Sequence, residues 1–398
     1  MTHKISDPIY FVDLFCGAGG LSCGLEQAGA TCLLGIDHNK HALKTFEHNH
    51  KSAKALYSSI EKVTESQIQT ILQGKTIDIL AGGPPCQGFS TVGMGNPEDS
   101  RNSLFQEYVR ILKILSPKYF IFENVTGILA KKNTNTLDAI FQEFFKQGYL
   151  LSLKVLNAAD FGIPQQRRRT FIMGVKKPFK LPSFPSPEAT SLTLGMALEK
   201  LSSLDTENLF NHDIEKSKIT DPLLKERMRC IPEGGSVRYK ADEEKYFPPS
   251  LRLGLDWESL PEKRLREERF KRPDTKGLSS TITATEQSFF HPTQERRFTT
   301  RELATIQSFP FDFVFQGPYS THHKQIGNAV PPLLAKKIGT EIIKTILEEK
   351  EKEKKEEKAK NTSFNKARQH WMEKVEGERK FAFIYKKEDK SKIFSAEI

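Results

Sequence analysis

Through residues 1–176, short apolar runs alternate with stretches in which apolar residues recur at the spacing of a helix. This alternation restricts the fold more than any other feature of the chain. The runs with the length of buried strands lie at residues 9–15, 31–36, 77–81, 119–123 and 171–175. Helical spacing of apolar residues marks residues 21–28, 103–115 and 137–145. Alternating strands and helices predict an α/β fold with a doubly wound, mostly parallel sheet.

The pattern changes after residue 176, which indicates a second, smaller and irregular domain. Residues 177–187 contain four prolines, which exclude regular structure and indicate a linker. Residues 188–297 lack the alternation and interleave Arg and Lys with aromatic residues. Helices are expected again from Thr300 and over residues 333–347. The domains predicted are thus 1–180, 188–297, a return segment at 298–347 and a charged C-terminal extension of unknown role at 348–398.

The distribution of charge favours a polyanionic partner. The chain carries 60 Lys and Arg against 50 Asp and Glu, a formal net charge of +10. Residues 348–360 hold six Lys and six Glu and add nothing to the net charge. Residues 1–180 hold 21 basic and 15 acidic residues, so the basic excess lies in the folded body. A solvated basic surface without a nucleic-acid partner is the alternative interpretation.

The cysteine pattern indicates neither a disulfide framework nor a metal site. The five cysteines, at positions 16, 23, 32, 86 and 230, form no Cys-x-x-Cys pair. No run of about 18 apolar residues is present, so no membrane span is expected. The polar N-terminus does not resemble a signal peptide, and a reduced cytoplasm suits free thiols.

A glycine-rich loop follows the first predicted strand, as in proteins that bind nucleotide-like cofactors. Gly17-Ala18-Gly19-Gly20 leads into a predicted helix, whose N-terminus offers free N–H groups and positive potential. Asp37 lies 20 residues after Gly17, at the end of the next strand, where a carboxylate suits ribose hydroxyls. NAD and S-adenosylmethionine both carry a ribose, so this pattern alone leaves both open.

A lone thiol stands where a ligand crevice is expected. Gly82-Gly83 end the strand at 77–81, and Pro84-Pro85 then lead to Cys86. Open α/β sheets place their crevices at the carboxyl ends of strands. A lone cysteine is more often a small buried hydrophobe, but the flanking prolines and the glycines of the following loop argue against burial.

Six motifs, in the same order, resemble those of bacterial DNA (cytosine-5)-methyltransferases of restriction–modification systems. They are DLFCGAGG at 13–20, PPCQ at 84–87, FENV at 122–125, QQRRR at 165–169, TRELATIQSFP at 300–310 and QIGNAVP at 325–331. The resemblance covers roughly residues 9–347, with one variable gap. It implies that residues 1–180 bind the cofactor and contain the catalytic residues. It also implies that residues 188–297 recognise the target DNA sequence and that residues 298–347 complete the catalytic domain.

The resemblance implies S-adenosylmethionine as the cofactor. Asp37 would bind the ribose, and His38 would stack near the adenine. The other residues that it assigns to the cofactor are Phe15, Gly17, Gly19, Gly20, Leu21, Ser59, Ile60, Pro85, Leu104, Asn328, Ala329 and Val330. Ser59 stands where many relatives carry an aspartate, so the adenine would meet a hydroxyl there instead of a carboxylate.

The resemblance also implies a covalent mechanism. A thiolate of Cys86 would add to C6 of cytosine, which makes C5 nucleophilic, while Glu123 would share a proton with N3. Arg169 would lie near the cytosine O2, and Arg167 near a phosphate or an active-site carboxylate. Strand alternation would place these two arginines on one face. A stacked cytosine cannot react in this way, so it must flip out, and the loop at 88–102 would close over it.

Double-stranded DNA is the expected substrate, with 188–297 reading the major groove and basic residues around 263–276 contacting phosphates. A monomer would act on DNA and protect it from a partner restriction endonuclease. Methylation of tRNA is the close alternative, which the long insert at 188–297 disfavours. A dehydrogenase would explain the glycine loop and Asp37 but leave Cys86, Glu123 and the arginine run unexplained. A non-catalytic DNA-binding protein would need none of these three features.

Overall fold

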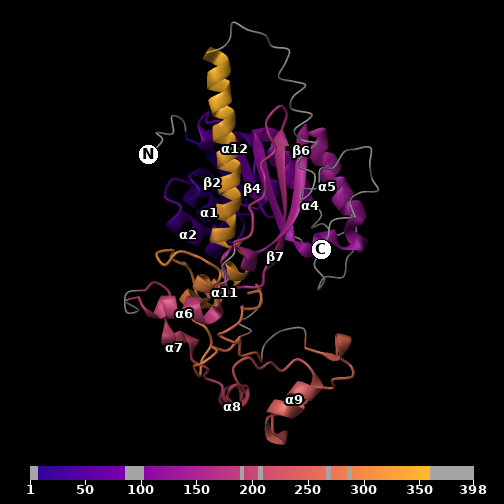
Figure 1. The fold of residues 1–398 in the computed structure, drawn as a ribbon, viewed down its shortest axis with the longest axis vertical. Helices are drawn as coiled ribbons and strands as arrows, with labels where there is room; N and C mark the ends of the chain where they lie inside the picture. The colour runs from indigo at the N-terminus through magenta and orange to yellow at the C-terminus, as the bar shows by residue number, and fades with distance from the viewer. Residues whose placement is uncertain are drawn as a thin grey trace. The chain divides into compact units, whose positions relative to one another are not determined.

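The computed structural model describes residues 8–85, 103–188, 192–204, 209–265, 270–284 and 289–358 (Figure 1). Cys86 and the loop at 88–102 lie outside these residues. By its internal contacts the chain divides into two units. The first unit contains Met1–Asn157, Arg168–Pro187 and Leu334–Ile398, and the second contains Ala158–Arg167 and Glu188–Leu333.

The first unit is built on a seven-stranded sheet with the order β3-β2-β1-β4-β5-β7-β6. Its strands are β1 Tyr10–Leu14, β2 Thr31–Asp37, β3 Lys54–Tyr57, β4 Ile79–Gly82, β5 Tyr119–Val125, β6 Tyr149–Asn157 and β7 Arg168–Lys176. Strands β1 to β5 pair in parallel, and β7 is antiparallel to both of its neighbours. The predicted doubly wound, mostly parallel sheet is confirmed. Its strand order reverses between β1 and β4, where such sheets bind their ligands.

Helices of the first unit follow the predicted order. They are α1 Gly20–Gln27, α2 Lys40–Asn49, α3 Glu65–Leu72, α4 Ser103–Leu115, α5 Thr134–Lys146 and α12 Pro332–Lys358, with short 3-10 helices at Ile60–Lys62, Thr126–Leu129 and Lys131–Asn133. Asn39 caps α2 through hydrogen bonds from the N–H groups of His41 and Ala42, and Thr64 and Gln67 form a capping box on α3. The apolar faces of α3, α4 and α5 bury against the sheet in one core.

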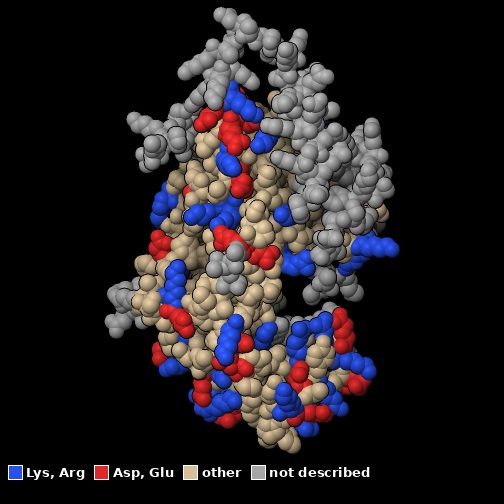
Figure 2. Space-filling view, viewed as in Figure 1, with Lys and Arg blue, Asp and Glu red and all other residues tan. Residues whose placement is uncertain are grey.

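Helix α12 is longer than the predicted 333–347 and continues to Lys358 (Figure 1). It packs closely on α1, because a Cβ added to Gly339 would lie 2.8 Å from Leu25 Cδ2. Its described end carries acidic and basic side chains together (Figure 2). The return segment expected at 298–347 is divided: residues up to Leu333 belong to the second unit, and the first unit resumes at Leu334.

The second unit is largely irregular. Its helices are α6 Leu194–Ser202, α7 Ile214–Ser217, α8 Pro222–Cys230, α9 Lys240–Tyr246, α10 Thr300–Ile306 and α11 Tyr319–Asn328, with 3-10 helices at Ala158–Phe161, Pro249–Leu251 and Pro261–Lys263. A small apolar core contains Met228, Phe247, Trp257, Phe270 and Phe290. Over the visible face of this unit, basic and acidic side chains are intermixed (Figure 2).

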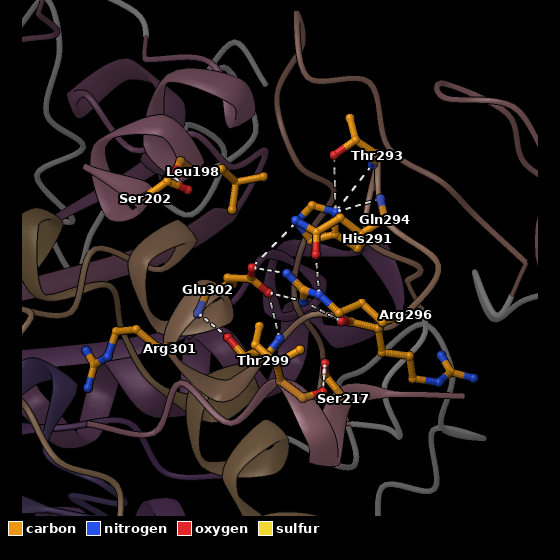
Figure 3. A network of polar contacts seen from close by, with 12 residues as sticks. Leu198, Ser202, Ser217, His291, Thr293, Gln294, Arg296, Thr299, Arg301 and Glu302 are labelled. Carbon is orange, nitrogen blue, oxygen red and sulfur yellow. Dashed lines mark hydrogen bonds and ion pairs between the residues drawn. The ribbon is translucent and has the colours of Figure 1, made fainter. Parts of the chain in front are cut away.

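A buried polar network surrounds the start of α10 (Figure 3). The Arg296 guanidinium donates from both Nη atoms to Glu302, at 2.6 and 2.7 Å. His291 Nε2 lies 3.5 Å from the same carboxylate, and Thr299 N donates to it at 2.7 Å. Burial opposes ionisation of Glu302, but the hydrogen bonds from Arg296 and His291 outweigh it and hold the Glu302 pKa at about 2. The carboxylate therefore stays charged although it is buried.

Among the helices that the structure describes, none is both long and apolar enough to cross a membrane. The described residues also contain no group of three His, Cys, Asp or Glu side chains arranged to hold a metal ion.

Candidate active site

The glycine loop lies at the carboxyl end of β1, at the point where the strand order reverses. Gly17 and Gly19 have φ angles of +55° and +92°, which residues other than glycine rarely adopt. A Cβ on Gly19 would lie 2.2 Å from His50 Nε2, whereas one on Gly17 would meet no atom within 4 Å. The loop is thus packed at Gly19 and open at Gly17. Gly19 also begins α1 without a side-chain cap, which leaves this helix end suited to a ligand.

Asp37 is fixed at the end of β2 beside this loop. Its Oδ2 accepts a hydrogen bond from Gly17 N at 2.8 Å, and its Oδ1 accepts one from Asn39 N at 2.7 Å. Each carboxylate oxygen keeps a further acceptor position, which a ribose hydroxyl can use. The open glycine loop, the uncapped start of α1 and this oriented carboxylate together fit the binding of S-adenosylmethionine.

A second carboxyl group, which the sequence analysis did not single out, lies beneath the loop. Asp13 in β1 is 1% exposed and accepts a hydrogen bond from Ser22 Oγ of α1 at 2.6 Å. Burial raises the Asp13 pKa to about 7, although the Ser22 hydrogen bond and His50 oppose the shift. This contact ties the first turn of α1 to β1. An acidic residue four positions before Gly17, the first glycine of the loop, was the available signal.

The carboxyl ends of β4 and β5 hold the predicted acid and one predicted arginine together. Glu123 Oε1 lies 3.1 Å from Arg169 Nε, and both side chains are largely buried. Because β7 is antiparallel to β5, its first residues lie at this edge, and Arg169 pairs in register with Val125. Burial lowers the pKa of the Arg169 guanidinium, and Glu123 opposes that shift.

The same edge fixes the backbone that leads to Cys86. Asn124 Nδ2 donates a hydrogen bond to the Pro84 carbonyl at 3.3 Å. A Cβ on Gly83 would lie 2.7 Å from Glu123 Oε2, so the carboxylate packs directly on the backbone three residues before Cys86. Asn124 was part of the quoted motif, but the sequence analysis assigned it no role.

In the structure, the Nη groups of Arg167 have partners other than the predicted phosphate or active-site carboxylate. Its side chain is 1% exposed and donates to three backbone carbonyls, those of Ile282, Gly327 and Ala329. Strand β7 begins at Arg168, so the strand alternation that was expected to place Arg167 and Arg169 on one face does not reach Arg167. Both Nη groups of this buried guanidinium are thus hydrogen-bonded to backbone carbonyls.

The remaining predicted cofactor residues fall into two groups. Those of the first unit are Phe15, Leu21, His38, Ser59, Ile60, Pro85 and Leu104. Phe15 has a φ of +58° where β1 turns into the glycine loop, and Leu21 and Ile60 are buried. His38 is 71% exposed, and the Ser59 hydroxyl donates to Glu61, which supplies a carboxylate one residue beyond Ile60. Asn328, Ala329 and Val330 belong to the second unit, where Asn328 is exposed at the end of α11.

Comparison with known proteins identifies the family. The profile of C-5 cytosine-specific DNA methylases matches residues 9–344. The chain is 34% identical over 342 residues to Type II methyltransferase M1.HphI of Haemophilus parahaemolyticus, an alignment that covers 84% of this chain and 86% of the relative. It is 34% identical over 373 residues to Type II methyltransferase M.XorII of Xanthomonas oryzae pv. oryzae, which covers 86% of each.

A solved E. coli structure, assigned as a DNA modification methyltransferase encoded within a prophage, has a TM-score of 0.67 at 23% identity and covers 85% of this chain and 99% of its own. That likeness supports the fold. The family match spans the glycine loop, the Glu123–Arg169 edge and the return to α12 in one alignment. The chain therefore belongs to the C-5 cytosine-specific DNA methylases and is a DNA (cytosine-5)-methyltransferase that uses S-adenosylmethionine.

Proposed function

We propose that this enzyme methylates C5 of a flipped-out cytosine in a specific double-stranded DNA sequence, through covalent addition of Cys86 to C6. The observation that supports this most strongly is the edge formed by β4, β5 and β7. There the Glu123–Arg169 pair lies beside the backbone of Gly83 and Pro84, which leads directly to Cys86. A carboxyl group and a guanidinium at the strand edge from which the chain continues to a cysteine suit addition of a thiolate to a polarised ring.

In this proposal each residue acts on a different atom of the cytosine. The Cys86 thiolate forms a bond to C6, and Glu123 holds a proton at N3 so that the ring accepts the electron pair. Arg169 donates to O2 and holds Glu123 in place. S-adenosylmethionine supplies an electrophilic methyl group, and C5 becomes nucleophilic enough to take it. Loss of the C5 proton then expels the Cys86 thiolate and restores the aromatic ring.

The cofactor would be held by the glycine loop and by Asp37, with Asn328, Ala329 and Val330 as further contacts. The thiolate and the methyl group must reach the faces of the cytosine ring, which are covered when the base is stacked in a duplex. Base flipping is therefore part of the proposal. Residues 188–297 would read the DNA sequence through the major groove. Acting as a cytoplasmic monomer on DNA, the enzyme would protect sites that a partner restriction endonuclease cleaves.

The test is transfer of a labelled methyl group from S-adenosylmethionine to double-stranded DNA and to tRNA, with mapping of 5-methylcytosine. Wild-type protein should label DNA at one sequence, and Cys86→Ser should reduce transfer to background because a serine hydroxyl stays protonated near neutral pH. Glu123→Gln should lower the rate by about 10²- to 10⁴-fold. Cys230→Ser, a change at a half-buried thiol of α8, is the matched control and should stay active. Labelling of tRNA in preference to DNA would contradict the proposal.

A further inference from the structure

Arg167 is among the largest fully buried side chains of the protein, and its hydrogen-bond acceptors indicate which part of the chain it stabilises. Its Nη1 donates to Ile282 O at 2.8 Å. Its Nη2 donates to Gly327 O at 2.7 Å and to Ala329 O at 2.9 Å. These last two carbonyls flank Asn328, the final residue of α11. One nitrogen thus bridges the carbonyls of the two residues that precede and follow the exposed Asn328.

Helix α11 needs such a partner at this end. The last carbonyl groups of a helix have no donor within the helix, and positive charge near them is favourable. Ala329 follows α11 in an extended conformation, with φ −69° and ψ 147°, so the helix stops abruptly at Asn328. Arg167 therefore acts as a side-chain cap for α11, supplied by a residue 160 positions earlier in the chain.

Two glutamines reinforce the same turn. Gln307 Nε2 donates to Ala329 O at 2.8 Å, and Gln165 Nε2 donates to Gln307 Oε1 at 2.5 Å. Gln165 Oε1 in turn accepts from Ile282 N at 3.2 Å. The backbone is tight here as well, because a Cβ on Gly327 would lie 2.1 Å from Thr283 O. The turn at 327–329 is consequently held from several directions, while the Asn328 side chain stays exposed.

We propose that Arg167 is a positioning residue for the cofactor: by bridging the carbonyls of Gly327 and Ala329, it sets the backbone from which Asn328 reaches S-adenosylmethionine. This inference rests on the proposed role of Asn328 at the cofactor. A planar guanidinium supplies several donors in a fixed fork, which a lysine ammonium on a flexible chain cannot reproduce at three carbonyls. The two arginines of the motif then have different roles. Arg169 contacts the cytosine base, and Arg167 holds the turn at 327–329 that contacts the cofactor.

A double-mutant cycle on cofactor affinity tests this coupling. S-adenosylmethionine binding would be measured by calorimetry for wild type, Arg167→Lys, Asn328→Ala and the double variant. Loss of the bridge leaves buried carbonyls without donors, so Arg167→Lys should raise the Kd by roughly 10-fold or more. In the Asn328→Ala background the same change should have little further effect, because the group it positions is gone. Arg168→Lys, at the exposed neighbouring position, is the matched control and should leave the Kd unchanged.

A purely structural role would give a different result. If Arg167→Lys weakens binding equally in both backgrounds, the cofactor contact of Asn328 stands and the positioning role of Arg167 is overturned. If Asn328→Ala leaves the Kd unchanged, the assigned cofactor contact fails, and this inference fails with it. Should Arg167→Lys not fold, Gln307→Met removes the second donor to Ala329 O, and it should show the same coupling to Asn328 with a smaller rise in Kd.

Discussion

The two units of the protein each bury a carboxyl group, and the two groups behave in opposite ways. Asp13, beneath the glycine loop, is 1% exposed and is hydrogen-bonded to the side chain and the backbone of Ser22. Burial raises its pKa to about 7. Glu302, at the start of α10, is 4% exposed but meets Arg296, His291 and a backbone N–H, and its pKa is about 2. Burial raises the pKa of both carboxyl groups, and the stronger partners of Glu302 account for the difference between them.

This contrast reflects how each unit is stabilised. The first unit buries apolar strands and helix faces on its sheet, so an isolated polar group there has few partners. The second unit has little regular structure and holds its loops with buried arginines: Arg296 on Glu302, Arg301 on the Phe210 and Pro310 carbonyls, and Arg167 on the turn at 327–329. The stability of the first unit is therefore sensitive to changes in packing, and that of the second unit is sensitive to the loss of single charged side chains.

The largest expected effect comes from breaking the network of the second unit. Glu302→Ala leaves the Arg296 guanidinium buried without its carboxylate, which should cost about 3–5 kcal/mol of local stability. Hydrogen exchange of peptides covering 289–306 would report this loss. Glu295→Ala removes an exposed partner of Arg229 nearby and should change exchange little. Equal protection in the two variants would contradict the account of the second unit.

A smaller effect is expected at the cofactor edge of the first unit. Asp37→Ala removes the carboxylate assigned to the ribose and should weaken S-adenosylmethionine binding roughly 10- to 150-fold, from the loss of about 1.5–3 kcal/mol. The same change removes the acceptor for Gly17 N, so the loop loses an anchor as well. Calorimetry measures the affinity, with Glu47→Ala on the exposed face of α2 as control. Unchanged affinity would place the ribose elsewhere.

Asp13→Asn should stabilise the protein at alkaline pH. A carboxyl group whose pKa rises from 3.8 to about 7 on folding holds its proton more tightly when folded, so its contribution to stability falls as pH rises across that range. The ionised form costs about 4 kcal/mol by pH 8, and a buried amide costs about 1–3 kcal/mol, so a net gain of about 1–3 kcal/mol is expected. Thermal melts at about pH 5 and about pH 8.5 should show a gain in the variant at the higher pH alone. A gain equal at both pH values would exclude ionisation of Asp13 as the cause.

The smallest effect is expected from the end of α12. Truncation after Lys350 keeps the part of the helix that packs on α1 and removes a charge-balanced region and the extension beyond it. The methylated sequence should stay the same, because residues 188–297 are proposed to read it. Residues 361–398 hold nine Lys and Arg against six Asp and Glu, so total DNA affinity should fall by less than about 10-fold. A folded truncation that methylates a different sequence would show that the extension takes part in recognition.

Much of the first unit was predictable because its signals are local. The apolar runs marked five of the seven strands, and the motif order placed Glu123 on the strand next to the one that leads to Cys86. Two strands, β3 and β6, went unpredicted: β3 is short and partly exposed, and the apolar residues of β6 are interrupted by Ser152 and Lys154. Capping residues also marked the start of α10.

The role of Arg167 could not be read from the sequence for a physical reason. Its acceptors are carbonyl groups 115 to 162 positions away, and backbone carbonyls leave no trace in residue type. The pKa of Asp13 was also hidden, since it depends on burial and on which side chains surround the carboxyl group. Triple arginines look alike in sequence, yet Arg167, Arg168 and Arg169 are respectively a buried clamp, an exposed side chain and a partner of Glu123.

Covalent addition by Cys86 is tested most directly with DNA in which every cytosine is replaced by 5-fluorocytosine, so that any recognition sequence carries the probe. Fluorine at C5 cannot leave as the proton does, and the enzyme should remain bonded to C6 after methyl transfer. Incubation with S-adenosylmethionine, followed by denaturation and peptide mass spectrometry, should find the adduct on Cys86. Cys86→Ser should form none. An adduct on another cysteine, or none in the active wild-type enzyme, would contradict the mechanism.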